Sequence, residues 1–183
     1  MKFLFASDIH GSFDACKNIL ACYEAEKADR LILLGDLLYH GARNPLPDGY
    51  NPKSVAEALN ALAVKPISVR GNCDSEVDQM VLNFPISADY TLLPLKNNKI
   101  AFLTHGHLFN IHSLPPIGPG DLLIHGHTHI HTVEDHQGIA YINPGSSALP
   151  FQNQPKSYMT LDWDQSLFEI KAFDGTILQS YTA

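Results

Sequence analysis

The sequence predicts an α/β fold in which two β-sheets pack face to face with helices outside them. In the first half of the chain, apolar runs alternate with helical patterns, an order that implies parallel strands joined by right-handed crossovers. In the second half, period-two patterns and hairpin turns predict mostly antiparallel strands. The chain has 183 residues, 45% hydrophobic and 17% charged, so we expect a single domain, residues 1–183, with a buried core.

Three strands and three helices are expected in the first half. Short apolar runs predict strands at 2–6, 31–34 and 66–69, and helical patterns cover 13–23, 52–63 and the residues from 75 toward 82. Ser12, Asn51 and Asp74 precede the three helices, and each can accept a hydrogen bond from a free backbone N–H group as an N-cap.

The second half is expected to form strands joined by turns. The strands are predicted at 91–95, 100–104, 122–125, 139–142, 158–161 and 167–173, with turns at 96–99 and 174–175. Before them, residues 37–51 form a long segment with two prolines and two glycines. Long ordered loops beside strand ends are often functional.

Composition excludes several functional classes. Twelve Lys and Arg against 19 Asp and Glu give a net charge of −7, which argues against a broad nucleic-acid surface or capture by an anionic membrane. No apolar run approaches the roughly 18 residues of a membrane span. Three cysteines, Cys16, Cys22 and Cys73, lack metal-knuckle spacing and favour a cytoplasmic location over an exported disulfide framework.

Histidine is concentrated in one part of the chain. Eight of the ten histidines fall between residues 105 and 136. A hydrogen-bonded core histidine explains any one of them, but such crowding indicates a use for imidazole, and a metal site is the first expectation.

Polar residues follow five apolar strands at the point where each strand ends. They are Asp8 and His10, Asp36, Asn72 and Asp74, His105 and His107, and His127 and His129. Each fragment alone is more often a turn. Because the carboxyl ends of parallel strands line one crevice, their joint occurrence predicts a shared cation site. Asp-x-His and His-x-His also place two ligands on the same side of an extended segment.

The motifs Asp-x-His, Gly-Asp, Gly-Asn-x-Asp, His and Gly-His-x-His, in this order, resemble those of the calcineurin-like metallophosphoesterase superfamily. The variants Gly-Asn-Cys-Asp, Thr-His-Gly-His and Asn-Pro-Gly-Ser at 143–146 are similar to those of small bacterial and archaeal phosphodiesterases, which share their fold with the retromer subunit Vps29. The resemblance covers nearly the whole chain. It implies a four-layer α/β/β/α sandwich with two mixed β-sheets.

The resemblance also implies a binuclear metal centre. It assigns one metal to Asp8, His10, Asp36 and His129, and the other to Asp36, Asn72, His105 and His127, with Asp36 bridging. This donor set suits divalent ions of intermediate hardness: Mn²⁺ is our first choice, and Zn²⁺, Fe or Ni²⁺ remain open. Two divalent ions would change the formal charge from −7 to −3. The expected activity is hydrolysis of a small phosphodiester by a metal-bound hydroxide.

The sequence departs from many superfamily members at Cys73. Those members have a histidine at this place, where it resembles a general acid for the leaving group, paired with the next acidic residue, here Asp74. A thiol with a pKa near ~8.5 is a poor replacement, so we expect a preference for diesters with aryl leaving groups over alkyl monoesters. Cys73 can equally be a small filler behind the metals, and Asn72 could also orient the phosphate.

Further candidates lie in loops. His40, Arg43 and Asn44 stand near Asp36 in the sequence, and Arg43 could bind a phosphate oxygen in a bidentate manner; a solvated loop is the equal alternative. His107 could support His105 or face solvent. His125 and His131 share the alternation but lie outside the motif.

Two other functions are compatible with the motifs. A non-enzymatic protein-binding scaffold, as the retromer subunit is, would have no reason to keep all seven expected ligands. A phosphomonoesterase or nucleotidase is disfavoured only by Cys73. The sequence leaves the physiological substrate undecided, and a homo-oligomer is possible.

Overall fold

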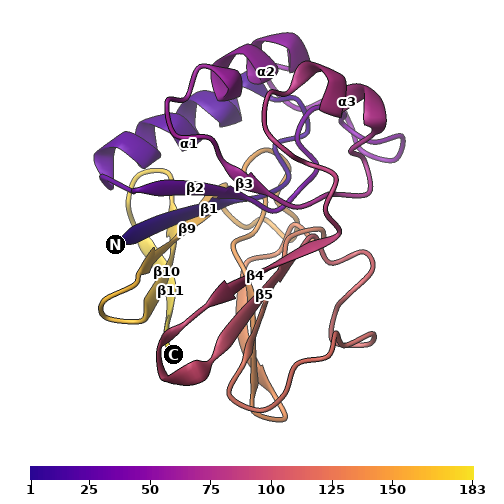
Figure 1. Cartoon of the computed structure of the whole chain (residues 1–183). Coiled ribbons are helices and arrows are strands. Elements are labelled where there is room, and N and C mark those ends of the chain that lie inside the picture. The colour runs from indigo at the N-terminus through magenta and orange to yellow at the C-terminus, as the bar shows by residue number, and fades with distance from the viewer.

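The computed structural model describes residues 1–183, and it contains two β-sheets that pack against each other (Figure 1). Three α-helices lie on the outer side of one sheet. In chain order the elements are β1 Lys2–Ala6, α1 Phe13–Ala25, β2 Arg30–Leu33, α2 Pro52–Asn60, β3 Ile67–Ser68, α3 Glu76–Val81, β4 Tyr90–Pro94, the 3₁₀ turn η1 Lys96–Asn98, β5 Ile100–Thr104, β6 Leu122–Ile124, β7 Thr132–His136, β8 Ile139–Asn143, β9 Ser157–Asp162, β10 Leu167–Ala172 and β11 Ile177–Thr182.

Both sheets are mixed. The six-stranded sheet has the order β11-β10-β9-β1-β2-β3, with β1, β2 and β3 parallel and the other pairs antiparallel. The five-stranded sheet has the order β4-β5-β6-β8-β7, with β5, β6 and β8 parallel. The α/β class and the two mixed sheets are therefore confirmed.

The strands of the second half are divided between the two sheets. β9 pairs with β1 and brings β10 and β11 into the first sheet. Five of the six β9 residues are buried, as suits an interior strand with neighbours on both edges. The strands β7 and β11 were not predicted, since both are sheet edges whose polar sequences stay half exposed.

Two of the three predicted helix N-caps are confirmed. Ser12 accepts a hydrogen bond from Ala15 N, and Asn51 accepts one from Ser54 N. The expected cap at Asp74 was wrong. The N-cap of α3 is the next residue, Ser75, and it forms a capping box with Asp78. The second helix also ends at Asn60, three residues earlier than expected.

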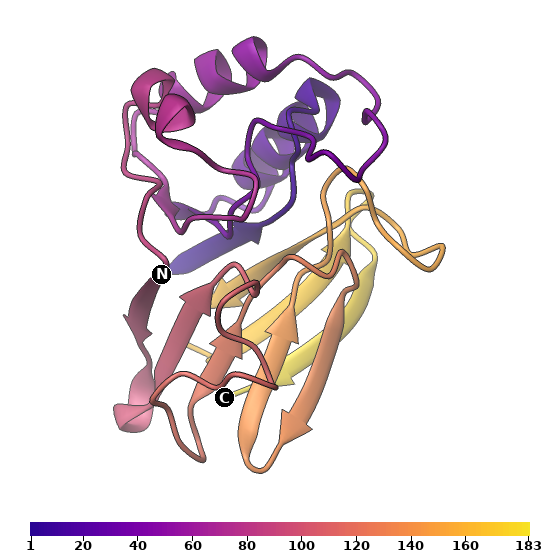
Figure 2. The ribbon, with the colours of Figure 1, turned by 90° about the vertical axis from the view of Figure 1, so that its right-hand side faces the viewer.

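The outer face of the five-stranded sheet is covered by a loop and not by a helix. Residues 105–121 cross this face as an irregular segment (Figure 2). Phe109, Ile111 and Ile117 pack there on a small cluster of buried sheet residues. Pro115 and Pro116 lack the N–H groups that a helix needs, so the fourth layer expected from the resemblance is present in this chain without helical structure.

One hydrophobic core lies between the two sheets. Its 15 buried residues come from both of them, among them Phe5, Ile32, Leu103, Ile124 and Met159. A second cluster of 17 buried residues packs α1 and α2 on the six-stranded sheet. No helix is long and apolar enough to cross a membrane. The core fixes β1, β2, β5 and β6 so that the loops after their carboxyl ends meet.

Candidate metal centre

The loops after these strands have an unusual backbone. Asp8, His10, Asp36, His127 and His129 all have positive φ angles, of 56°, 49°, 56°, 67° and 59°. Residues with a side chain rarely adopt this conformation, and where they do, the strain is often associated with function. Five strained residues, all among the seven expected ligands, therefore lie in these loops.

Two glycines let the loops approach one another closely. A Cβ atom at Gly71 would overlap Asp36, and one at Gly126 would overlap Ser7 and Asp8. Only glycine leaves room for neighbours this close. The glycines noted in the motifs thus have a steric role in forming the site.

The expected carboxylates and imidazoles converge in the interior. Asp36 Oδ2 lies 3.6 Å from His10 Nε2 and 3.4 Å from His105 Nε2. Asp8 Oδ1 lies 3.3 Å from His129 Nε2, 3.6 Å from His10 Nε2 and 4.0 Å from His105 Nε2. All five side chains are buried. We call these five residues the cage.

Hydrogen bonds to main-chain carbonyls orient the three imidazoles of the cage. The Nδ1 atoms of His10, His105 and His129 lie 3.0, 2.7 and 2.6 Å from the carbonyl oxygens of Tyr39, Leu34 and Leu149. With Nδ1–H donated to a carbonyl, each Nε2 points toward the carboxylates, where loss of its proton would leave a lone pair for a metal ion. This arrangement is the one found for metal-bound histidines.

The cage attracts positive charge. Burial alone would raise the pKa of Asp8, but His10 and His129 hold it well below its usual value. Burial would lower the pKa of His105, but Asp36 and Asp8 outweigh it and raise that pKa to about 9. The carboxylates are therefore ionised at neutral pH, and the cluster is suited to a cation.

The donor atoms fit divalent metal ions. Asp8 Oδ1 is buried without a hydrogen bond, which is costly unless something else binds it. The Nε2 atoms of His10 and His129 face each other at 3.1 Å. Three triads have donor atoms within 4.8 Å of one another, and two of them, Asp8–His10–His129 and Asp8–Asp36–His105, contain only oxygen and imidazole donors. Oxygen and imidazole donors in such triads can hold two neighbouring cations.

The two remaining expected ligands lie at the solvent side. Asn72 is exposed, and its Oδ1 is 3.1 Å from His105 Nε2. His127 is half-buried; its backbone N–H donates to Asp8 Oδ2, and its ring centroid is 5.0 Å from that of His105. His127 is in none of the triads. The side of the cage beside His105 is thus the more open one.

Cys73 lies against the cage as a neutral thiol. Its backbone N–H donates to Asp36 Oδ1 at 2.8 Å, and its Sγ is 3.2 Å from Asn72 Nδ2. Burial, with Asp36 adding to the effect, raises the pKa of the thiol to about 12. The sulfur also lies within reach of His10 and Asp36.

Asp74 is a buried connector and neither a helix cap nor a partner of Cys73. Its carboxylate accepts hydrogen bonds from the backbone N–H groups of Asp36, Leu37 and Gly71, at 2.9, 2.8 and 2.7 Å. It therefore fixes the loop that carries Asp36 to the loop that carries Asn72. Sequence spacing could not reveal the bonds to Asp36 and Leu37 because they join residues 38 and 37 positions apart.

An open cleft of about 780 Å³ lies over the cage. Arg43 and Asn44 line it as expected, together with Thr128 and Phe151, which the sequence did not indicate. His40 does not line it: its ring packs 4.7 Å from Tyr39 and 5.4 Å from Tyr50 between centroids. The expectation that His40 contacts substrate has no support in this geometry.

The Asn-Pro-Gly-Ser segment has a structural role that the sequence did not predict. Ser146 Oγ donates to the carbonyl of Asp8 and accepts from Leu149 N, so it positions one end of the cage. Asn143 Nδ2 donates to Gly126 O and Thr128 Oγ1 and holds the loop of His127 and His129.

The other histidines lie outside the cage. His107 does not hold His105, whose hydrogen bonds go to Leu34 and Asn72, and His107 Nδ1 is buried without a partner. His125 packs on Tyr141, and His131 bonds Gln179 of β11. None of the three offers a ligand atom to the triads.

Comparison with known proteins agrees with this geometry. The model of the calcineurin-like phosphoesterase superfamily domain matches residues 1–166. The chain is 50% identical to phosphodiesterase YfcE of Escherichia coli K12 over 164 residues, 90% of this chain and 89% of that protein. It is 31% identical to the probable metallophosphoesterase YsnB of Bacillus subtilis over 182 residues, 95% of this chain and 91% of that protein.

Solved structures give the same result. The structure of the E. coli phosphoesterase YfcE superposes with a TM-score of 0.94 at 45% identity, covering 100% of this chain and 99% of that one. Vps29 of Cryptosporidium parvum shares the fold, with a TM-score of 0.64 at 18% identity and coverage of 100% and 98%. The chain belongs to the calcineurin-like phosphoesterase superfamily, as the motifs indicated.

Proposed function

We propose that this protein is a metal-dependent phosphodiesterase that works with two divalent ions, Mn²⁺ in the first place. The observation that carries the proposal is the cage: two ionised carboxylates and three oriented imidazoles converge under an open cleft, and one buried carboxylate oxygen has no hydrogen bond. The proposed ligands are the seven residues expected from the motifs, Asp8, His10, Asp36, Asn72, His105, His127 and His129.

The ions would supply Lewis acidity toward phosphoryl oxygens and a lowered water pKa, near ~7. The protein's own groups would do the rest. Asp8 and Asp36 would hold the cations, and both carboxylates are buried away from water. Asn72 is exposed at the cleft wall, where its amide can also donate to a phosphate oxygen. Arg43, which also lines the cleft, can bind a second oxygen in a bidentate manner.

The neutral thiol of Cys73 supports a preference for diesters with good leaving groups. A group with a pKa of about 12 is a weak proton donor at pH 7. An alkoxide leaving group needs a proton, whereas an aryl oxide leaves without one. The relative with 50% identity is named a phosphodiesterase, which agrees with this proposal.

The proposal is tested by metal reconstitution. Protein stripped with a chelator and reloaded with Mn²⁺ should hydrolyse bis(p-nitrophenyl) phosphate and act poorly on an alkyl monoester such as methyl phosphate. The stripped form and the reloaded Asp36→Asn variant are the controls, and both should be inactive. Hydrolysis of neither ester by the reloaded protein would leave the scaffold function of Vps29-like proteins as the better account.

Replacing Cys73 by histidine tests the role of the leaving-group proton. We expect Cys73→His to raise monoester hydrolysis about 10-fold or more, since a positioned general acid contributes about 10²–10⁴-fold. A Cys73→Ser variant is the control, because a hydroxyl fills the same space without an imidazole's pKa. Unchanged monoester hydrolysis in Cys73→His would show that Cys73 is only a filler.

Location and assembly remain proposals. The three free thiols, two of them buried, support a cytoplasmic location. The net charge of −7 supports a small phosphodiester over nucleic acid as substrate. A homo-oligomer is compatible with these findings.

A further inference from the structure

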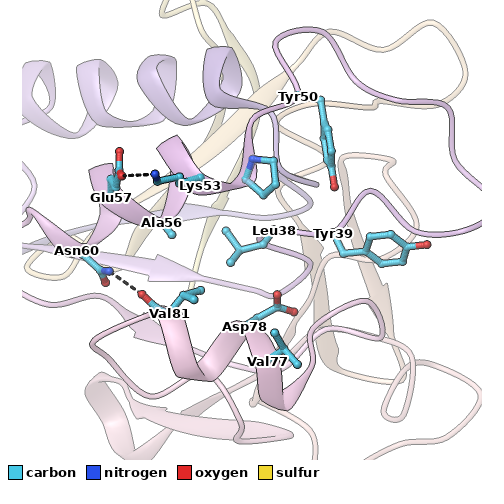
Figure 3. A pocket seen from close by; sticks show the side chains of 11 residues that line it. Leu38, Tyr39, Tyr50, Lys53, Ala56, Glu57, Asn60, Val77, Asp78 and Val81 are labelled. Carbon is cyan, nitrogen blue, oxygen red and sulfur yellow. Dashed lines mark hydrogen bonds and ion pairs between the residues drawn. The ribbon is translucent and has the colours of Figure 1, made fainter.

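A second cavity lies beside the metal cleft, between α2 and α3 (Figure 3). Its volume is about 490 Å³, a size that suits an organic group of a small ligand. Leu38 and Ala56 are its buried apolar residues, and Val77 and Val81 of α3 line it opposite α2. We call this cavity the α2–α3 groove.

The groove is apolar and exposed. Val77 and Val81 are 67% and 52% exposed, although both are aliphatic. Three of its lining residues are charged: Lys53 faces Glu57 at 4.0 Å, and Asp78, whose carboxylate accepts hydrogen bonds from Ser75, has no cation beside it among the lining residues. One positive and two negative groups would repel a second phosphate, so the groove suits an uncharged apolar group.

The groove adjoins the metal cleft, and Tyr39 forms part of the wall of both. The carbonyl oxygen of Tyr39 accepts the hydrogen bond of His10 Nδ1. At the far end, Asn60 Nδ2 donates to Val81 O at 2.8 Å and joins the two helices. Figure 3 shows Tyr39 and Tyr50 together at the opposite end. A ligand bound at the cage can thus extend past Tyr39 into the groove.

We propose that the α2–α3 groove binds an uncharged apolar ester group of the phosphodiester, so that the preferred substrates carry an alkyl or aryl substituent there. This inference rests on the proposed function. The groove itself lies outside the cage and adds a specificity determinant: a phosphate at the cations, and its hydrocarbon substituent between α2 and α3.

Binding of n-alkyl phosphates to the Mn²⁺-loaded protein tests the groove directly. Isothermal titration calorimetry with methyl, butyl and hexyl phosphate should give a Kd that falls about twofold per methylene. A fully buried methylene would give about fourfold, but the groove is open on one side. The heat capacity of binding should become more negative with chain length, the signature of apolar burial.

Two variants of α3 separate the groove from the helix surface. Val81→Asp puts a charge into the groove and should abolish the dependence of Kd on chain length. Met80→Asp is the matched control, because Met80 is 83% exposed on the same helix and does not line the groove. Met80→Asp should keep the dependence. Circular dichroism melting shows that both variants are folded.

The outcomes are distinct. Equal Kd values for all three alkyl phosphates, in a protein that hydrolyses the aryl diester, would overturn the groove proposal and leave the phosphodiesterase intact. Absence of aryl diester hydrolysis would overturn the function itself. A third outcome combines two results: sedimentation shows an oligomer that both α3 variants dissociate, and Kd does not depend on chain length. In that case a second copy of the chain covers the groove, and the proposal is wrong.

Discussion

Two buried polar clusters in this molecule are built on opposite principles. Around Glu26, every charge has a partner: Lys171 Nζ lies 2.9 Å from one carboxylate oxygen, Tyr158 Oη donates to the same oxygen at 3.0 Å, and Lys2 pairs with the other. Lys171 also pairs with Glu169. This cluster is complete within the protein.

In the cage, by contrast, some polar groups have no suitable partner within the protein. Asp8 Oδ1 has no hydrogen bond, and the Nε2 atoms of His10 and His129 face each other. Carboxylates and imidazole lone pairs there need cations that the protein does not provide. A paired cluster stabilises the fold, whereas an unpaired one costs stability and keeps a place for a ligand. Removing a carboxylate charge should therefore lower stability in the Glu26 cluster and activity in the cage.

The largest effect is expected from Asp36→Asn. Weakening the metal centre should lower kcat/KM for an aryl phosphodiester by about 10³-fold or more. The metal-free variant should melt at about the same temperature as the wild type, since losing the repulsion between Asp36 and Asp8 offsets losing the attraction between Asp36 and His105. Steady-state kinetics and melting curves in chelator check both. A large fall in the melting temperature would show that the cage is a structural element.

The next effect is expected from Asp74→Asn. One amide N–H₂ group would then face backbone donors, so we expect a loss of about 1–3 kcal/mol in the free energy of unfolding and about 10²-fold lower activity. Urea denaturation and kinetics give the two numbers. Asp174→Asn, in an exposed turn, is the control and should change neither. Full activity in Asp74→Asn would contradict the connecting role.

Glu26→Gln should lower stability and leave activity unchanged, the reverse of Asp36→Asn. It leaves Lys2 and Lys171 without their shared carboxylate, and we expect a loss of about 2–3 kcal/mol of unfolding free energy, because the Glu26 side chain is only 15% exposed. Activity at a temperature where the variant is folded should stay unchanged. A variant as stable as the wild type would remove the contrast between the clusters.

The Glu26 cluster also predicts a pH dependence. Burial would raise the pKa of Glu26, but Lys2, Lys171 and Tyr158 lower it from 4.5 to about 2. A depressed folded-state pKa gives stability that is present above about pH 4.5 and is lost as the pH falls toward 2. Urea titrations between pH 6 and 2.5 should show this loss in the wild type, and a smaller loss in Glu26→Gln.

The smallest effect is expected from Arg43→Ala. Arg43 is exposed at the wall of the cleft, so its removal should raise KM about 3- to 10-fold and leave kcat nearly unchanged. Arg43→Lys should recover part of the loss, since a point charge replaces a bidentate group. Kinetics identical to the wild type would mean that the loop is merely solvated.

The sequence was sufficient for the cage because its signal is local. Each ligand pair follows an apolar strand by a fixed, short spacing, and Asp8 and His10 could be recognised without knowing what faces them. Strand pairing was less accessible: β9 joins β1 across more than 150 residues, and only burial of β9 shows it to be an interior strand.

The supporting groups could not be predicted for the same reason. The partners of His10, His105 and His129 are main-chain carbonyls of Tyr39, Leu34 and Leu149, which carry no residue-type signal. Asp74 looked like a helix cap because an acidic residue before a helix usually is one. Its three backbone partners lie in loops that only the packed sheets bring together.

The stoichiometry of Mn²⁺ binding tests most directly whether the cage is a site for two cations. Electron paramagnetic resonance of the stripped protein, titrated with Mn²⁺, should show two bound ions per chain with a spin-coupled spectrum, and Asp36→Asn should lose the coupling. Wild-type protein that binds no Mn²⁺, or Asp36→Asn that retains the coupled pair, would contradict the account.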